Sequence, residues 1–332
     1  MPQIVEIRKA DDPRDVIHRA CQLLAEGQLV AFPTETTYVV AASTSNESGL
    51  KRLQAVASGR SVLALKSPEE AHDYLTRMPK AADRLIRRAW PGPLTMEFAS
   101  SVLDGLYHEL PEAARLMLES ADSFVGLRVA AHEALIHVQR LSPLPMVVTA
   151  DRGAARPLPR TAEDVVSRFG DAVDLIIDDG ACRYGEPTTT VRFAGDRWNV
   201  VEQGVISALN LDRLTSEIFL FVCTGNTCRS PMAEALFRRR LAERLKCGDD
   251  ELMDRGFAVL SAGLSARAGG PASGEAISVL NDEGIDLRSH ESQPVTARLL
   301  QQADHIVTMT RGHHHAIVSE FPELASRVSM LS

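Results

Sequence analysis

A cysteine and an arginine separated by five residues stand between an apolar run and a helical stretch. The segment from Cys223 to Ser230 reads CTGNTCRS; the run 218–222 precedes it and PMAEALFRRRLAERL follows. In a short strand-to-helix loop, successive backbone N–H groups point to one place at a helix N-terminus, which suits an anion. Arg229 can add a bidentate grip on phosphate oxygens. The spacing therefore predicts a phosphate-binding loop.

The same positive environment favours the thiolate form of Cys223 near neutral pH. A thiolate can attack phosphorus and form a covalent phosphocysteine, which water later hydrolyses. Ser230 is placed to hydrogen-bond the sulfur, and Gly225 and Asn226 tolerate the left-handed backbone that a tight loop needs. The alternative is a plain strand-to-helix turn whose cysteines are simply buried.

Composition bounds the class of protein. The chain has 332 residues, 45% hydrophobic and 24% charged, which favours two globular domains. Its formal net charge of −8 argues against broad nucleic-acid binding. Its five cysteines form no Cys-x-x-Cys pair and suggest a reducing compartment without a disulfide framework or zinc site. No apolar run approaches the roughly 18 residues of a membrane span, and the N-terminus does not resemble a signal peptide. We therefore expect a cytoplasmic protein with no membrane partner.

Three smaller signals have plain structural explanations. The consecutive His313, His314 and His315 point in different directions on a helix, so we expect a solvated helix start and no metal site. Asp178 and Asp179 fit the needs of a DDG turn. The basic stretches RLIRRAW and FRRRLAERL fit exposed helix faces, with a weak RNA contact as the minor alternative.

The elements that must position the loop follow from the apolar patterns. In the C-terminal part, strand and helix patterns alternate, which predicts a four-stranded parallel sheet with helices on both faces. The N-terminal part mixes strands and helices and predicts an α+β or α/β domain. A polar stretch places the boundary near 208–216, giving domains 1–208 and 217–332. The predicted strands are 29–34, 124–129, 145–150, 174–179, 188–193, 218–222, 257–263, 305–310 and 327–331, and the predicted helices are 12–27, 80–90, 162–170, 231–245 and 271–284.

The segment FVCTGNTCRSPMAEALF closely resembles the low-molecular-weight protein phosphatases, as do SAG, PAS, GIDLRSHES and ADHIVTMT further along. The resemblance covers about residues 217–332. It implies that Cys223 is the nucleophile, that Arg229 binds the phosphoryl group, and that Ser230 assists catalysis. It implies a phosphoprotein substrate and no cofactor. The implied phosphate-binding residues are Thr224, Gly225, Asn226, Thr227 and Cys228.

Three details of this resemblance bear on the chemistry. Thr227 stands where phosphotyrosine phosphatases usually carry an aliphatic residue, and it resembles the branch that acts on phosphoarginine, because a hydroxyl can hydrogen-bond a guanidinium. Cys228 matches a second loop cysteine that can pair with the nucleophile on oxidation; an ordinary small loop residue is the equal alternative. The family's general acid lies in an Asp-Pro loop after the fourth strand. No Asp-Pro pair lies between Cys223 and Ser332, so we expect either a truncated sequence or a missing acid.

The N-terminal segment LVAFPTETTYVVAA resembles the threonylcarbamoyl-AMP synthases, or YrdC-like domains. WPGPLTMEF, VGLRV, PTTTV and GVIS fit the same family in the same order, over about residues 10–207. This resemblance implies formation of threonylcarbamoyl-AMP from ATP, threonine and bicarbonate for tRNA modification, with ATP as cofactor and Mg as an optional companion. The implied threonine and nucleotide site comprises Pro33, Thr34, Glu35, Thr36, Arg128 near the phosphates, and Thr149.

Several expected features of the synthase family are absent. The family's glycine after the tyrosine is Val39, and its Ser-Ala-Asn is Thr149, Ala150 and Asp151. Its Lys-x-Arg motif should fall near 57–60, where AVASGRS has no lysine. Losing that lysine removes much of the charge that holds a triphosphate. We therefore expect a thiol-dependent phosphatase fused to a synthase-like domain, and we expect that domain to be a degenerate nucleotide or threonine binder rather than an active synthase. The alternative is a non-catalytic nucleotide- and phosphate-binding protein; the sequence does not predict its oligomeric state.

Overall fold

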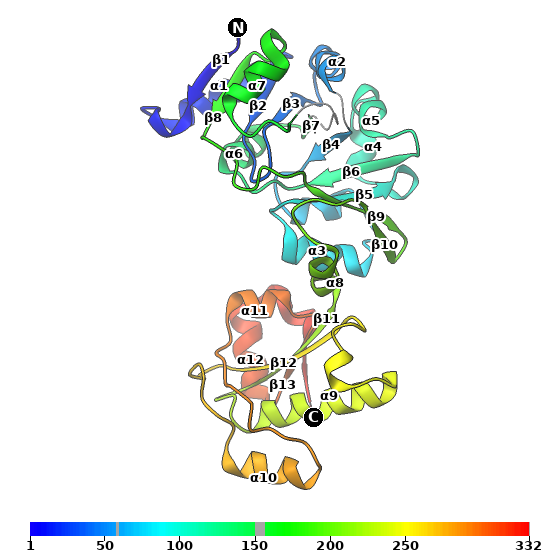
Figure 1. The fold of residues 1–332 in the computed structure, drawn as a ribbon, viewed down its shortest axis with the longest axis vertical. Coiled ribbons are helices and arrows are strands. Elements are labelled where there is room, and N and C mark those ends of the chain that lie inside the picture. Colours follow the sequence, from blue (N-terminus) through cyan, green and yellow to red (C-terminus); the bar gives the residue numbers. More distant parts are fainter. Residues whose placement is uncertain (58–59, 150–156, 332) are drawn as a thin grey trace. The chain divides into compact units, whose positions relative to one another are not determined.

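The computed structural model describes residues 1–57, 60–149 and 157–331. The chain divides into two compact units, Met1–Leu211 (unit 1) and Asp212–Ser332 (unit 2), each with its own sheet (Figure 1). The division falls inside α8 (Ala208–Thr215), a helix formed by the polar stretch that follows the last strand of unit 1. Among the described residues, no helix has the length and apolar character needed to cross a membrane.

Unit 1 is built on a ten-stranded mixed sheet in the order β1-β8-β2-β3-β7-β4-β6-β5-β9-β10. Its strands are β1 (Gln3–Glu6), β2 (Val30–Phe32), β3 (Val39–Ser43), β4 (Ser61–Ala64), β5 (Leu94–Ala99), β6 (Phe124–Arg128), β7 (Met146–Thr149), β8 (Leu175–Asp178), β9 (Thr189–Ala194) and β10 (Arg197–Glu202). Its α-helices are α1 (Pro13–Ala25), α2 (Glu47–Val56), α3 (Lys80–Ala89), α4 (Leu106–Glu109), α5 (Glu112–Leu118), α6 (Glu133–Leu141) and α7 (Ala162–Phe169). Short 3-10 turns lie at Ile7–Lys9, Glu69–Asp73, Ser100–Val102 and Gly170–Ala172.

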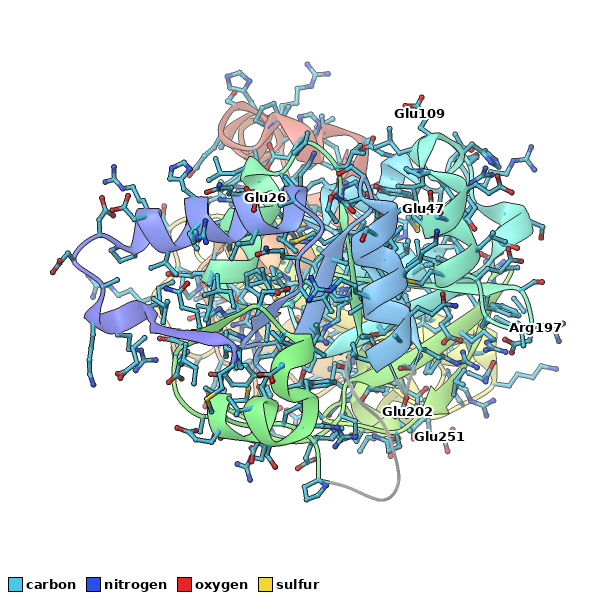
Figure 2. All side chains as sticks on the ribbon, turned by 90° about the horizontal axis from the view of Figure 1, so that it is seen from above. Glu26, Glu47, Glu109, Arg197, Glu202 and Glu251 are labelled. Atoms are coloured by element: carbon cyan, nitrogen blue, oxygen red, sulfur yellow. The ribbon has the colours of Figure 1, made fainter. Side chains whose placement is uncertain are left out.

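Local sequence explains why α1 forms where it does. Pro13 occupies the first turn, where a missing N–H costs nothing, and the Asp12 side chain accepts a hydrogen bond from Arg14 N. The buried residues of α1 recur at helical spacing and pack with β2, β3 and α6 in one core. The exposed charges lie outside this core, as Glu47, Glu109 and Arg197 show (Figure 2).

Unit 2 is a four-stranded parallel sheet in the order β12-β11-β13-β14. Its strands are β11 (Glu217–Cys223), β12 (Phe257–Gly263), β13 (His305–Thr308) and β14 (Val328–Met330), and its α-helices are α9 (Arg229–Leu245), α10 (Gly274–Asp282), α11 (Ala297–Gln302) and α12 (Arg311–Glu320). Two 3-10 turns lie at Asp249–Glu251 and Pro322–Arg327. The predicted α/β fold class and the four-stranded parallel sheet are both confirmed.

Helices cover both faces of this sheet. The side chains of β11 point alternately to the two faces, and the apolar ones pack against helices on each. Phe219 and Phe221 contact Phe237 of α9 on one face. Leu220 and Val222 join the core formed with α11 and α12 on the other face. This double burial explains the continuous apolar run in the sequence. The carboxyl end of β11 is thereby fixed, and the loop to α9 begins there.

Candidate active site

The loop between β11 and α9 holds the predicted nucleophile. Cys223 is the last residue of β11 and is buried. Its sulfur accepts hydrogen bonds from Asn226 N at 3.2 Å and from Ser230 Oγ at 3.0 Å. The loop leads directly into the 17-residue helix α9, whose N-terminus carries partial positive charge. The sulfur therefore lies beside two hydrogen-bond donors and the N-terminus of a long helix.

Asn226 holds the loop in shape from its buried centre. Its backbone φ of 53° is left-handed, as the sequence predicts, whereas Gly225 lies outside the left-handed region. The Asn226 amide nitrogen donates to Ser230 Oγ at 3.0 Å and to Ser261 Oγ at 2.8 Å. Its amide oxygen accepts from Gln293 N at 2.8 Å. These buried bonds connect the loop to β12 and to the segment that follows α10.

The arginine of the loop begins α9 and is exposed. Arg229 Nη2 donates to Thr224 Oγ1 at 3.4 Å, so the two ends of the loop are joined. Cys228 immediately precedes the helix and carries a free thiol. Thr227 is half-buried, and its carbonyl accepts from Ser273 N at 2.7 Å. The structure therefore brings the predicted phosphatase residues together around one loop.

Several neighbours of the loop were given no role by the sequence. His290 Nε2 lies 2.7 Å from Asn226 O, and Gln293 Nε2 donates to Ser261 O at 2.9 Å. A Cβ on Gly263 would approach Thr224 O to 2.6 Å, so this position needs glycine. Ser261, Gly263 and His290 belong to the SAG and SHES motifs, and these motifs were the sequence features that could have identified them as neighbours of the loop.

A polar cavity of about 440 Å³ lies on the side of the loop formed by Ser261 and His290. Glu234 of α9 lines it, and burial raises the pKa of this carboxyl, against the opposing influence of Ser261, Arg238 and His290. Glu234 is thus a partly buried acid whose charged form is disfavoured.

The histidine run differs from its predicted solvated state. His313 is buried and lies against the loop, while His315 is exposed. Among the described residues, no group of three or more His, Cys, Asp or Glu side chains could hold a metal ion.

The predicted threonine pocket of unit 1 is a buried polar cluster after β2. Arg128, at the end of β6, donates through Nη2 to Glu35 Oε1 at 2.8 Å and to Thr36 Oγ1 at 2.9 Å. Glu35 Oε2 accepts from Ala131 N at 2.8 Å, and Thr34 Oγ1 donates to Thr37 O at 2.6 Å. Such a buried ion pair requires these further hydrogen bonds. The structure therefore joins Arg128 to Thr34, Glu35 and Thr36, and a contact of Arg128 with phosphates stays a prediction.

Of the other predicted residues of unit 1, Pro33 adjoins this cluster, and Thr149 lies beside Arg60. Pro33 lines a cavity of about 360 Å³ together with Thr34 and Glu35. Thr149, at the end of β7, is buried, and its hydroxyl donates to Arg60 O at 3.5 Å. Ala150 and Asp151 lie outside the described residues, as do Ser58 and Gly59 of the AVASGRS segment.

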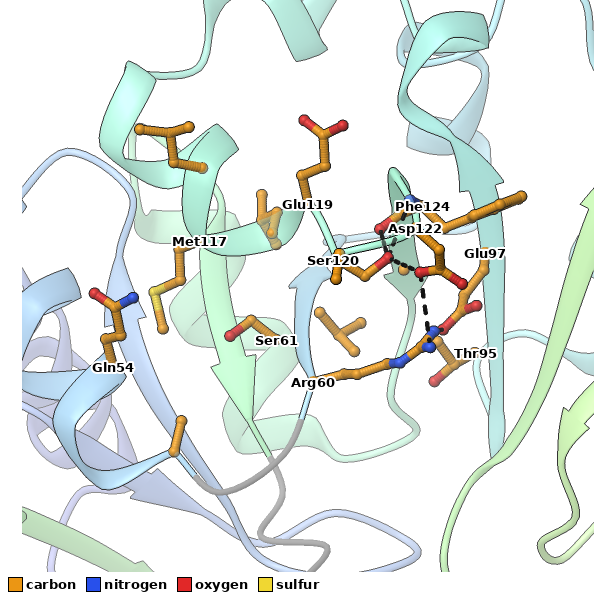
Figure 3. A pocket seen from close by; sticks show the side chains of 16 residues that line it. Gln54, Arg60, Ser61, Thr95, Glu97, Met117, Glu119, Ser120, Asp122 and Phe124 are labelled. Atoms are coloured by element: carbon orange, nitrogen blue, oxygen red, sulfur yellow. Dashed lines mark hydrogen bonds and ion pairs between the residues drawn. The ribbon is translucent and has the colours of Figure 1, made fainter.

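Arg60 lines a cavity of about 650 Å³ in unit 1, and its charge is already paired (Figure 3). It forms an ion pair with Glu97, which is buried on β5. Arg192 of β9 pairs with the same carboxylate at 2.7 Å and with Asp122 at 2.5 Å. Hydrogen bonds from Ser120 and Arg192 lower the pKa of Asp122 to about 2. Two arginines therefore face two carboxylates beside the cavity.

Sequence reasoning gave no role to Glu97, Asp122 or Arg192. The signal was present in the strands LTMEF and TTTVRF, each of which places one charged residue in an otherwise uncharged run. The two charged residues can be identified as an ion pair only once the register of β5 and β9 is known, because that register sets Glu97 opposite Arg192.

Comparison with known proteins supports both resemblances. The family model "Low molecular weight phosphotyrosine protein phosphatase" matches residues 218–332, and the model "Telomere recombination", which covers Sua5, YciO and YrdC, matches residues 22–204.

Two curated relatives match different parts of the chain. A protein-arginine-phosphatase of Bacillus subtilis is 41% identical over 112 residues, covering 34% of this chain and 68% of the relative. A threonylcarbamoyl-AMP synthase of Pyrococcus abyssi is 31% identical over 180 residues, covering 53% of this chain and 50% of the relative. The chain thus spans half the length of that synthase.

A solved structure of a Pyrococcus abyssi Sua5 variant has a TM-score of 0.55 at 21% identity, covering 100% of this chain and 99% of that one. This likeness shows a shared fold. The chain belongs to the Sua5, YciO and YrdC family through residues 22–204 and to the low molecular weight phosphotyrosine protein phosphatase family through residues 218–332.

Proposed function

We propose that residues 217–332 form a cysteine-dependent protein phosphatase that acts through a phosphocysteine intermediate. The observation that supports this most strongly is the Cys223 sulfur, which accepts hydrogen bonds from Asn226 N and Ser230 Oγ. The sulfur lies where β11 meets the N-terminus of α9, with Arg229 as the first residue of that helix. A thiolate nucleophile and a phosphate-binding guanidinium are thereby joined in one loop.

In the proposed reaction the Cys223 thiolate attacks phosphorus. An S–P bond forms as the bond from phosphorus to the leaving oxygen or nitrogen breaks, and the leaving group takes the electron pair and accepts a proton from solvent water. Arg229 binds the phosphoryl oxygens through paired N–H donors. Water then attacks the phosphocysteine and releases phosphate and a thiolate, which the Ser230 hydroxyl stabilises by its hydrogen bond.

We propose phosphoarginine in a protein as the favoured substrate, with phosphotyrosine as the second. Thr227 supports this preference, because its hydroxyl can hydrogen-bond a guanidinium, whereas an aliphatic residue at this place would favour an aromatic ring. A phosphoprotein is accordingly the proposed partner of unit 2.

The test of the phosphatase proposal is Cys223→Ser in the full chain. Turnover of an aryl phosphate should be lost, while inorganic phosphate should still bind, because the loop and Arg229 remain. The measurements are initial rates with the wild-type chain and the variant, and phosphate affinity by calorimetry. Unchanged turnover in the variant would remove Cys223 as the nucleophile. Phosphate binding without turnover in the wild-type chain would favour the non-catalytic alternative.

For unit 1 we propose binding of threonine and nucleotide with slow formation of threonylcarbamoyl-AMP. The family membership and the buried Glu35–Arg128 cluster support a threonine site. The pairing of Arg60 with Glu97 disfavours tight triphosphate binding, because the guanidinium charge is already compensated. A weak RNA contact is the proposed partner interaction of this unit.

A further inference from the structure

Helix α12 contacts the phosphate-binding loop through a buried histidine. The strands β11 and β13 are parallel neighbours, so their carboxyl ends lie side by side. Met309 N donates to Val222 O at 3.0 Å, one residue before the loop begins. Thr310 then caps α12 by accepting from His313 N at 3.3 Å. This cap places His313 in the first turn of the helix, beside the loop.

The His313 side chain contacts the loop through Thr224. Its Nε2 atom lies 2.9 Å from Thr224 Oγ1, and the same hydroxyl oxygen accepts from Arg229 Nη2 at 3.4 Å. Thr224 directly follows the nucleophile Cys223 and is exposed, whereas His313 is 8% exposed. Two hydrogen bonds therefore link the buried imidazole of His313, through the Thr224 hydroxyl, to the exposed guanidinium of Arg229.

The chemistry of these three side chains determines which atoms donate and which accept in the two hydrogen bonds. Burial and the charge of Arg229 lower the pKa of His313, which favours the neutral imidazole. The guanidinium can only donate, so Thr224 Oγ1 accepts its hydrogen bond. The hydroxyl can donate to Nε2 in one imidazole tautomer or accept from Nε2–H in the other. Both tautomers fix the hydroxyl, and through it the arginine.

We propose that His313 is a positioning residue for phosphate binding, which orients the Arg229 guanidinium through the Thr224 hydroxyl. The inference rests on the proposed phosphatase function and adds a residue from outside the loop. The Nδ1 atom of this buried histidine has no hydrogen-bond partner among the described residues. The hydrogen bond of Nε2 with Thr224 gives the imidazole a role beyond packing.

The test uses the full chain and measures inhibition of aryl phosphate hydrolysis by inorganic phosphate, together with phosphate affinity by calorimetry. His313→Leu removes the hydrogen bond and should weaken phosphate binding about 3- to 10-fold, the range that one hydrogen bond supports. His313→Gln can still bond the Thr224 hydroxyl and should stay within about 2-fold of the wild-type chain. His315→Leu, on the exposed side of the same helix, is the control and should leave binding unchanged.

Thr224 supplies a second route to the same test, should the buried His313→Leu variant fail to fold. Thr224→Val at this exposed position should reproduce the loss, and Thr224→Ser, which keeps the hydroxyl, should bind phosphate more tightly than Thr224→Val. The double variant His313→Leu/Thr224→Val should bind phosphate no more weakly than either single variant, because both remove one shared interaction. Wild-type affinity in Thr224→Val, or additive losses in the double variant, would overturn the inference. An inactive wild-type chain would count against the proposed phosphatase, while phosphate affinity would still decide the role of His313.

Discussion

At the scale of single residues, the loop depends on Asn226 as much as on Cys223. Its side chain makes three hydrogen bonds in a buried place, and its backbone is left-handed. Asparagine combines a side chain with both donor and acceptor groups and a tolerance of this backbone conformation. The sequence indicated the tolerance, because the residue type is visible. It did not indicate Ser261 or Gln293 as partners, because they come from distant segments.

Asn226→Ala should therefore damage both stability and turnover. The change leaves buried partners unsatisfied, each at a cost of about 1–3 kcal/mol, and places alanine at a φ of 53°. Asn226→Gly is the matched control, since it loses the same bonds and keeps the backbone freedom. The measurements are aryl phosphate turnover and hydrogen exchange of the β11 amides. Exchange as slow as in the wild-type chain would show that the side-chain bonds do not stabilise the loop.

Thr227→Ile should shift substrate preference from phosphoarginine towards phosphotyrosine. The isoleucine side chain cannot hydrogen-bond a guanidinium, and it offers apolar contact to an aromatic ring. The ratio of kcat/KM for the two phosphorylated peptides is the measurement, with Thr227→Ser as the variant that keeps the hydroxyl. A ratio that is the same in all three proteins would remove Thr227 as the discriminating residue.

At the scale of elements, burial explains only part of what could be predicted, because the buried strands β3, β4 and β5 were not predicted. The run 218–222 of β11 is apolar throughout because both faces of the strand are covered, and helix α3 ends within one residue of its predicted bound. The edge strand β1 was missed because three of its four residues are exposed. The ion pairs of Glu97 depend on the order β6-β5-β9, and strand order is set by packing across the whole sheet rather than by local sequence.

Helix α9 carries a pH-dependent element in Glu234. Burial raises the pKa of this carboxyl, so the folded state binds its proton more tightly than the unfolded state. Stability from this group is fully present below the unfolded pKa and is lost as pH rises through the raised folded value. Glu234→Gln should remove this loss.

The measurement is hydrogen exchange of unit 2 amides between pH 4 and pH 7, corrected for the intrinsic rate. Tryptophan fluorescence would not serve, because Trp90 and Trp198, the two tryptophans of the chain, both lie in unit 1. The Glu234→Gln variant should gain protection relative to the wild-type chain as pH rises. A pH-independent difference between the two proteins would contradict the assignment.

At the scale of the whole molecule, two units with separate sheets belong to two different protein families. Each unit has its own hydrophobic core, and the sequence predicted both domains from short motifs. Motifs identify the residues that contact a substrate, but they do not report compensating charges such as Glu97. The motifs of unit 1 therefore do not predict whether this unit is active.

The full chain should bind ATP weakly and release pyrophosphate slowly in the presence of threonine and bicarbonate. Arg60 is the remaining cation of the altered Lys-x-Arg segment, and Glu97 neutralises it. Glu97→Gln leaves Asp122 as the carboxylate shared by Arg192, at 2.5 Å, and Arg60, at 3.9 Å. The site beside the cavity thereby gains one net positive charge, so ATP affinity should rise several-fold. The gain in ATP affinity should shrink at high salt, because the added attraction is between charges.

Both proteins are best compared in the Cys223→Ser background, so that no phosphate is released by unit 2. Robust threonine-dependent release by the chain with Glu97 intact would show that the altered segment still supports synthesis. Equal ATP affinity with and without Glu97 would show that its pairing with Arg60 does not limit nucleotide binding.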